Sequence, residues 1–178
     1  MDKRLVLVLG GARSGKSRYA QELAPRLGTS VAYLATASAG DDEMRTRIEK
    51  HRRERPADWQ TIEARECIGD VLALVHADVV LLDCMTLLVS NVIIAAGEEA
   101  SFDTLQARVN AEVEGILAAY RAGRFSLVIV SNEVGMGIVP EYALGRFYRD
   151  LLGAANQRLA LAADEVLLMV AGLPMKVK

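Results

Sequence analysis

The segment LVLVLGGARSGKS, residues 5–17, decides the fold that this sequence predicts. Its apolar first part, Leu5 to Leu9, is typical of a buried β-strand, and Gly10 to Ser17 has the spacing Gly, four residues, Gly-Lys-Ser. In that pattern the glycines let backbone N–H groups approach phosphate oxygens, the lysine reaches the β- and γ-phosphates, and the serine hydroxyl can hold Mg²⁺. The segment therefore predicts a strand, a phosphate-binding loop (P-loop) and a helix. The alternative is a solvated glycine-rich turn.

Apolar runs further along the chain extend the first strand into a sheet. Runs rich in β-branched and aliphatic residues recur, with polar segments of helical character between them, at Val31 to Ala35, Val79 to Leu82, Leu127 to Val130 and Val166 to Val170. Strands that are apolar on both faces belong to parallel sheets covered by helices on both sides. We therefore predict a single α/β domain over residues 1–178, with a mostly parallel sheet and helices on both faces.

The intervening segments predict the helices of this domain. They are expected at about Lys16 to Leu27, Asp41 to Arg55, Ile68 to Val75, Phe102 to Ala122 and Ala143 to Ala162.

Bulk composition limits the classes of function. The 178 residues are 52% hydrophobic and 25% charged, which is ordinary for a globular protein. A net charge of −2 gives no general attraction to nucleic acid or anionic membranes, and no apolar stretch is long enough to span a membrane or form a signal peptide core. Cys67 and Cys84 lack paired or metal-ligand spacing, which fits a reducing compartment. We expect a cytoplasmic protein that binds small anions at a local site.

Asp83 is the candidate metal ligand beside the P-loop. It follows the apolar run Val79 to Leu82, so its carboxylate should lie at the carboxyl end of a buried strand, where open α/β sheets bind ligands. There it could hold Mg²⁺ directly or through water. The alternative is that Asp83 caps the segment after the strand.

The predicted helix Asp41 to Arg55 carries one of the two histidines of the chain. Arginines and a lysine surround His51 in sequence, and nearby cations disfavour the imidazolium, so the ring should be neutral and nucleophilic near pH 7. The same cations could stabilise charge on a phosphate under attack. Residue chemistry leaves two interpretations open, a catalytic histidine and a surface histidine on a self-paired basic helix. His76 is expected to be structural.

Six segments, taken together and in order, resemble one family, the bifunctional adenosylcobinamide kinase and adenosylcobinamide-phosphate guanylyltransferase of cobalamin biosynthesis. The P-loop alone marks only a superfamily, whereas RI-x-x-H-x-x-x-RP together with NEVGMGIVPE is specific. The segments are GGARSGKS at 10–17, YLATA at 33–37, DDEMRTRIEKHRRERPADWQTIE at 41–63, LLDCMTLLVSN at 81–91, SNEVGMGIVPE at 131–141 and NQRLALAADEVLLMVAGLP at 156–174.

The resemblance implies a RecA-like P-loop fold and assigns roles to particular residues. The family's histidine that becomes covalently attached to GMP falls on His51, and Lys16 is the second catalytic residue. Ser17 and Asp83 are the implied Mg²⁺ ligands. The implied nucleotide-binding residues are Gly10, Gly11, Ala12, Arg13, Ser14, Gly15, Lys16, Ser17, Ala35, Thr36, Ala37, Arg52, Arg53, Glu54, Arg55, Glu63 and Asp83.

The reaction that the resemblance implies has two halves. ATP or GTP phosphorylates adenosylcobinamide, and GMP from GTP then passes through the histidine to adenosylcobinamide phosphate, giving adenosyl-GDP-cobinamide. The family also implies a trimer with active sites near subunit contacts. The segment at 131–141, with Gly135 and Gly137, either lines the corrinoid site or is a plain glycine-containing loop.

Two alternatives to this reaction remain open. One is a P-loop small-molecule kinase without the guanylyltransferase step. The other is a P-loop module that hydrolyses ATP to drive a partner or DNA. The slightly acidic net charge and the lack of a basic DNA-binding stripe in the sequence disfavour it.

Overall fold

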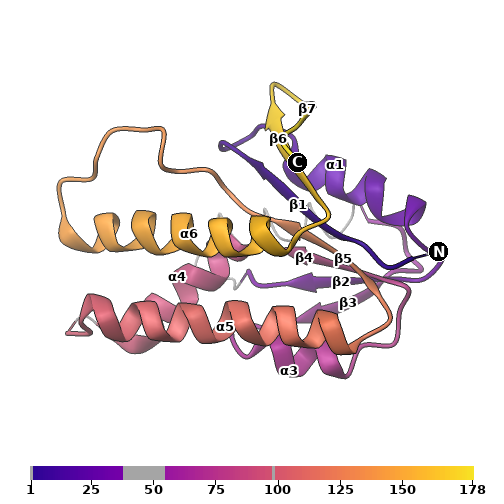
Figure 1. The fold of residues 1–178 in the computed structure, drawn as a ribbon, viewed down its shortest axis with the longest axis horizontal. Coiled ribbons are helices and arrows are strands. Elements are labelled where there is room, and N and C mark those ends of the chain that lie inside the picture. The colour runs from indigo at the N-terminus through magenta and orange to yellow at the C-terminus, as the bar shows by residue number, and fades with distance from the viewer. Residues whose placement is uncertain (1, 38–54, 98) are drawn as a thin grey trace.

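The structure is a computed structural model that describes residues 2–37, 55–97 and 99–178. Within these ranges it contains one seven-stranded sheet with the order β3-β2-β4-β5-β1-β6-β7 (Figure 1). The strands are β1 Leu5–Gly10, β2 Val31–Ala35, β3 Gln60–Glu63, β4 Val79–Asp83, β5 Ser126–Val130, β6 Glu165–Val170 and β7 Leu173–Lys176. The strand pairs are all parallel except β6 with β7, which form an antiparallel hairpin. The mostly parallel sheet is therefore confirmed.

Helices cover both faces of the sheet, as the apolar character of the strands predicts (Figure 1). One face packs against α1 and a short 3₁₀ helix, η1, through Ala20 and Ala24. The other face packs against the remaining helices and holds the larger core. The helices are α1 Lys16–Leu23, η1 Ala24–Arg26, α3 Ile68–Ala73, α4 Met85–Ala96, α5 Phe102–Ala122 and α6 Ala143–Ala162.

The helix ends follow local chemistry. The predicted helix from Lys16 ends as an α-helix at Leu23, and the chain tightens into η1, which contains Pro25. Proline cannot donate the backbone hydrogen bond that a continuing α-helix requires. Helix α5 begins as predicted, because the Ser101 hydroxyl accepts a hydrogen bond from the Thr104 N–H at 3.2 Å and caps the first turn.

Three elements were not predicted from the sequence, and each lacks the pattern that would have indicated it. Strand β3 is polar and half exposed at one edge of the sheet, and β7 is exposed at the other edge and contains Pro174. Helix α4 is almost uniformly apolar, so no helical period is visible in its sequence. The predicted helix from Asp41 lies outside the described residues except for Arg55, which lies in a bend.

Among the described residues, no helix is both long and apolar enough to cross a membrane.

Candidate functional site

The candidate site lies along the carboxyl edge of the parallel strands. Glu63, Ala35, Asp83 and Val130, from four adjacent strands, are register partners in one row across the sheet. Strand β1 follows next and continues to Gly10, where the P-loop begins. Open α/β sheets bind their ligands at this edge. The sheet therefore brings together predicted residues that lie far apart in the sequence.

The P-loop backbone takes a shape that glycine permits. Gly15 caps the amino end of α1 with a φ of 93°, and Gly10 has a φ of 149°. A Cβ at Gly10 would lie 2.7 Å from the Met169 carbonyl oxygen and 2.7 Å from the Ser14 hydroxyl oxygen. The first turn of α1 contains no acidic side chain, so the positive end of the helix dipole is not neutralised locally. Such a loop and helix end can receive phosphate oxygens.

Lys16 folds back over the loop instead of extending into solvent. Its side chain is buried, and its Nζ donates a hydrogen bond to the Gly11 carbonyl oxygen at 2.6 Å. The Ser14 hydroxyl is also buried, and within the described residues it has no hydrogen-bond partner. A buried hydroxyl without a partner is unfavourable. The loop thus contains a buried ammonium group and, among the described residues, a buried hydroxyl without a hydrogen-bond partner.

The hairpin of β6 and β7 braces the P-loop, a contact that the sequence did not predict. The Gly172 N–H in the hairpin turn donates to the Ser14 carbonyl oxygen at 3.0 Å. A Cβ at Gly15 would lie 3.2 Å from the Gly172 Cα, so the turn and the loop pack backbone against backbone. At the start of the P-loop, the Gly10 carbonyl oxygen accepts a hydrogen bond from the Glu133 N–H at 3.0 Å. The loop is therefore held by two neighbouring segments, the β6–β7 turn and the chain after β5.

Asp83 ends β4 and is contacted by Tyr33 of β2. The Tyr33 hydroxyl donates to Asp83 Oδ2 at 2.8 Å, and the Arg55 guanidinium lies 3.6 Å from the centroid of the Tyr33 ring. Burial, together with the negative charge of Asp83, raises the pKa of Tyr33 well above its ordinary value. The phenol therefore stays protonated and acts as a hydrogen-bond donor.

The segment after β2 is fastened to the end of β4. The fully buried Thr36 hydroxyl accepts from the Cys84 N–H at 2.8 Å and donates to the Cys84 carbonyl oxygen at 2.7 Å. Asn91 of α4 donates to the Thr36 carbonyl oxygen at 3.0 Å. These bonds hold Ala35, Thr36 and Ala37 beside Asp83.

Cys84, which follows Asp83, is an unreactive neighbour. Burial, and then the charge of Asp83, raise the pKa of the Cys84 thiol to about 11. At neutral pH the group is therefore a thiol and a weak nucleophile. Within the described residues both cysteines are free.

A buried polar network supports the chain after β5. Ser131 donates to Asn156 Oδ1 at 2.6 Å, and Asn156 Nδ2 donates to the Asn132 carbonyl oxygen at 3.0 Å. The Asn132 N–H in turn donates to the Thr86 hydroxyl at 3.0 Å. Thr86 and Asn156 had no predicted role, whereas Ser131 and Asn132 belong to the predicted corrinoid segment at 131–141. An asparagine among the apolar residues of the α6 segment was the signal that could have indicated a buried polar contact.

The oxygen donors at this edge fit Mg²⁺. Ser17 lies in the first turn of α1 and offers a hydroxyl, and Asp83 offers a carboxylate, both hard oxygen ligands. Within the described residues no group of three His, Cys, Asp or Glu side chains could form a metal cage. Such a sparse donor set suits Mg²⁺, which takes most of its ligands from phosphates and water.

The structure thus places most of the predicted site residues along one edge. Gly10 to Ser17, Ala35 to Ala37, Glu63 and Asp83 lie there, with Arg55 against Tyr33. Predicted residues His51, Arg52, Arg53 and Glu54 lie outside the described residues.

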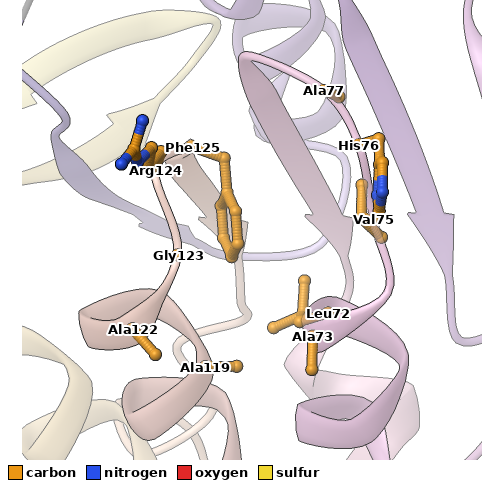
Figure 2. A pocket seen from close by; sticks show the side chains of 10 residues that line it. All are labelled: Leu72, Ala73, Val75, His76, Ala77, Ala119, Ala122, Gly123, Arg124 and Phe125. Atoms are coloured by element: carbon orange, nitrogen blue, oxygen red, sulfur yellow. The ribbon is translucent and has the colours of Figure 1, made fainter.

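A pocket of about 310 Å³ lies at the opposite edge of the sheet (Figure 2). It is bordered by the ends of α3 and α5 and by the segments that lead into β4 and β5. His76 lines it, and its Nδ1 hydrogen-bonds to the Leu74 carbonyl oxygen at 3.0 Å. None of the predicted site residues that the structure describes lines this pocket. The geometry therefore separates His76 from the nucleotide edge.

Comparison with known proteins agrees with this geometry. A family model described as cobinamide kinase / cobinamide phosphate guanyltransferase matches residues 6–177. The chain is 44% identical to the bifunctional adenosylcobalamin biosynthesis protein CobU of Escherichia coli K12, with 98% of this chain and 99% of that protein covered. It is 42% identical to CobU of Salmonella typhimurium LT2, with 98% and 99% covered. It is 40% identical to CobP of Pseudomonas aeruginosa PAO1, with 97% and 96% covered.

The fold is also similar to a solved structure of distant sequence. A crystal structure of the RadB recombinase matches with a TM-score of 0.51 and 15% identity, over 93% of this chain and 73% of that one. At this level of identity the likeness concerns the fold alone, and it confirms the RecA-like P-loop architecture.

Proposed function

The chain belongs to the cobinamide kinase / cobinamide phosphate guanyltransferase family and is a bifunctional enzyme; we propose that its guanylyltransferase half uses His51 as a covalent GMP carrier. In the first half-reaction a nucleoside triphosphate, ATP or GTP, phosphorylates adenosylcobinamide. In the second, GMP from GTP is joined to adenosylcobinamide phosphate to give adenosyl-GDP-cobinamide. The convergence of the P-loop, Lys16 and Asp83 at one edge of the sheet supports the binding of the nucleotide there, and the assignment of His51 rests on the family resemblance.

The P-loop residues perform the kinase half. Backbone N–H groups from Gly10 to Ser17 bind the phosphates, and Lys16 offsets the charge that develops as the γ-phosphoryl group is transferred. Ser17 and Asp83 would hold Mg²⁺, which when bound would neutralise charge on the phosphate oxygens. Residues 35–37, Arg55 and Glu63 are the remaining proposed nucleotide-binding residues within the described ranges.

His51 performs the transferase half. It attacks the α-phosphate of GTP, pyrophosphate leaves, and the phosphate of adenosylcobinamide phosphate then takes the GMP from the histidine. Arg52, Arg53 and Glu54 are proposed to contact the nucleotide beside it. Arg55, four residues after His51 in the sequence, stacks on the Tyr33 ring, and Tyr33 hydrogen-bonds Asp83. Arg55 therefore lies beside the carboxyl edge of the sheet. Because Arg55 is close to His51 in the sequence, its position supports this assignment.

The segment at 131–141 is proposed to contact the corrinoid. It projects from the carboxyl edge between β5 and α6 (Figure 1) and carries the exposed apolar side chains of Met136, Ile138 and Val139. A large ligand with apolar substituents would cover such side chains.

The proposal also includes a trimeric assembly and a cytoplasmic location. The location is proposed because free thiols persist in reducing compartments.

The covalent step is tested by labelling with GTP. Wild-type protein incubated with GTP labelled at the α-phosphate should acquire a label that is labile in acid and stable in alkali, as expected for a phosphorus–nitrogen bond. His51→Asn should bind GTP but remain unlabelled. His76→Asn is the matched control, because it removes the other histidine at the opposite edge of the sheet and should label like the wild type.

The outcomes distinguish the reactions. Wild-type protein that binds GTP and transfers its γ-phosphate, but acquires no α-label, would contradict the covalent step and indicate a kinase alone. A label that persists in His51→Asn would assign the step to another residue.

A further inference from the structure

Tyr33 links the carboxylate of Asp83 to the sheet face that carries α1. The register partner of Tyr33 on β4 is Leu81. Side chains two residues apart on a strand share a face, so the Asp83 side chain points to the same face of the sheet as Leu81. Leu81 and Tyr33 both pack in the core beneath α1, the helix that the P-loop opens. The Tyr33 hydroxyl thus reaches diagonally across to Asp83 Oδ2, at 2.8 Å.

The hydrogen bond occupies one carboxylate oxygen and leaves the other for a ligand. Within the described residues, Asp83 Oδ1 accepts no hydrogen bond. A carboxylate that can rotate must be ordered when it binds a metal, whereas a carboxylate held by one oxygen already presents the other in a set direction.

The donor itself is rigid. The Tyr33 side chain is only 3% exposed, and Arg55 covers its ring at 3.6 Å from the centroid. Arg55 is in turn tied by its Nη1 to the Thr61 hydroxyl at 3.2 Å, and Thr61 is the register partner of Tyr33 on β3. The ring plane, and with it the direction of the hydroxyl, is therefore set before any ligand arrives.

We propose that Tyr33 is a positioning residue that orients Asp83 so that one carboxylate oxygen faces the metal ion of the bound nucleoside triphosphate. Tyr33 acts through Asp83 and does not touch the nucleotide. The inference rests on the proposed function, because it requires a metal–nucleotide complex at the P-loop.

The test compares nucleotide affinity with and without metal. In Tyr33→Phe the ring and its packing against Arg55 remain, and only the hydroxyl is lost. Isothermal titration should show GTP affinity in EDTA within about twofold of wild type, because the phosphate contacts of the loop are intact. The gain in affinity that Mg²⁺ confers should fall by about tenfold, the typical effect of removing a partner of a metal ligand. Electron paramagnetic resonance of Mn²⁺ should show correspondingly weaker metal binding to the protein–GTP complex.

Two further variants separate positioning from a general packing role. Tyr19→Phe is the matched control, because Tyr19 packs against the same core but makes no hydrogen bond through its hydroxyl within the described residues; it should retain the full Mg²⁺ effect. In the Asp83→Asn background, adding Tyr33→Phe should cause no further loss of the Mg²⁺-dependent gain in GTP affinity, since Tyr33 acts through the Asp83 carboxylate.

Each contrary result has a distinct meaning. The inference would be overturned if Mg²⁺ raised the GTP affinity of Tyr33→Phe as much as that of the wild type, or if Tyr33→Phe lost equal GTP affinity with and without metal. It would also be overturned if the losses of Mg²⁺-dependent affinity caused by Tyr33→Phe and Asp83→Asn were additive. Absence of Mg²⁺-dependent GTP binding in the wild type would instead contradict the proposed function.

Discussion

At the residue scale, Asp78 shows how one exposed carboxylate joins two segments of the fold. Its Oδ2 accepts hydrogen bonds from the Ser30 N–H at 2.9 Å, the Thr29 hydroxyl at 2.7 Å and the Thr29 N–H at 3.0 Å. These bonds, led by that from the Ser30 backbone, lower the pKa of Asp78 from 3.8 to about 2. These side-chain bonds therefore tie the start of β4 to the start of β2 most strongly while Asp78 is ionised.

The lowered pKa predicts how stability depends on pH. Because the folded pKa is lower than the unfolded one, ionised Asp78 stabilises the fold above about pH 4, and this contribution is lost as the pH falls toward 2. Asp78→Asn should therefore lower the melting temperature at pH 7, and the difference from wild type should vanish between about pH 4 and pH 2. Thermal melts at closely spaced pH values measure this effect.

Asp58→Asn supplies the comparison for Asp78→Asn. Asp58 is exposed and accepts no side-chain hydrogen bond within the described residues, so its variant should melt like the wild type throughout. A constant difference between Asp78→Asn and wild type down to pH 2 would refute the assignment.

At the scale of elements, the crossing of α3 and α5 depends on two glycines with unequal surroundings. A Cβ at Gly69 would lie 2.6 Å from the backbone carbonyl carbon of Gly115, whereas a Cβ at Gly115 would lie 3.6 Å from the Gly69 Cα. Glu112 of α5 also caps the short helix α3, accepting from the Cys67 N–H at 2.6 Å and the Ile68 N–H at 3.0 Å. The two helices are thus joined by close backbone contact and by a carboxylate.

This asymmetry predicts different effects on stability for the same substitution at the two glycines. Gly69→Ala should lower the free energy of unfolding by about 1–3 kcal/mol, because the backbone it meets can give way only if the helices separate. Gly115→Ala should be neutral or raise it by about 0.5–1 kcal/mol, because alanine favours a helix interior and its Cβ makes an ordinary contact. Urea denaturation of the two variants measures both values. Equal destabilisation by the two substitutions would contradict the described crossing.

At the scale of the whole molecule, the surface around the carboxyl edge carries apolar side chains that this single chain leaves uncovered. Ile138 is 98% exposed and Met136 is 82% exposed, both in the segment between β5 and α6. Exposed apolar side chains in one projecting segment are typical of a surface that meets a ligand or another chain. This observation is compatible with the corrinoid and trimer proposals.

The trimer proposal predicts a mass in solution. Light scattering with size-exclusion chromatography should give about three times the 19.3 kDa of one chain. A mass of one chain at micromolar concentration would contradict the trimer without affecting the assignment of the P-loop.

Much of the fold could be predicted because its signals are local. The five central strands are continuous apolar runs, and the P-loop is a contiguous pattern whose strand, loop and helix follow one another at residues 5–23. Edge strands β3 and β7 and the uniformly apolar helix α4 escaped prediction, because neither alternation nor helical periodicity marks them. The roles of His51 to Glu54 came from family resemblance and lie outside the described residues.

By itself, the sequence determined the strand–loop–helix segment with Gly10, Lys16 and Ser17, because covalent spacing suffices to place those groups together. Tertiary structure alone decided that Tyr33 meets Asp83 and that Gly172 meets Ser14. Those partners are 50 and 158 residues apart, and the contacts exist because β2 pairs with β4 and the hairpin of β6 and β7 follows β1 in the sheet. Strand order is a property of how the whole core packs, and no local pattern in the chain encodes it.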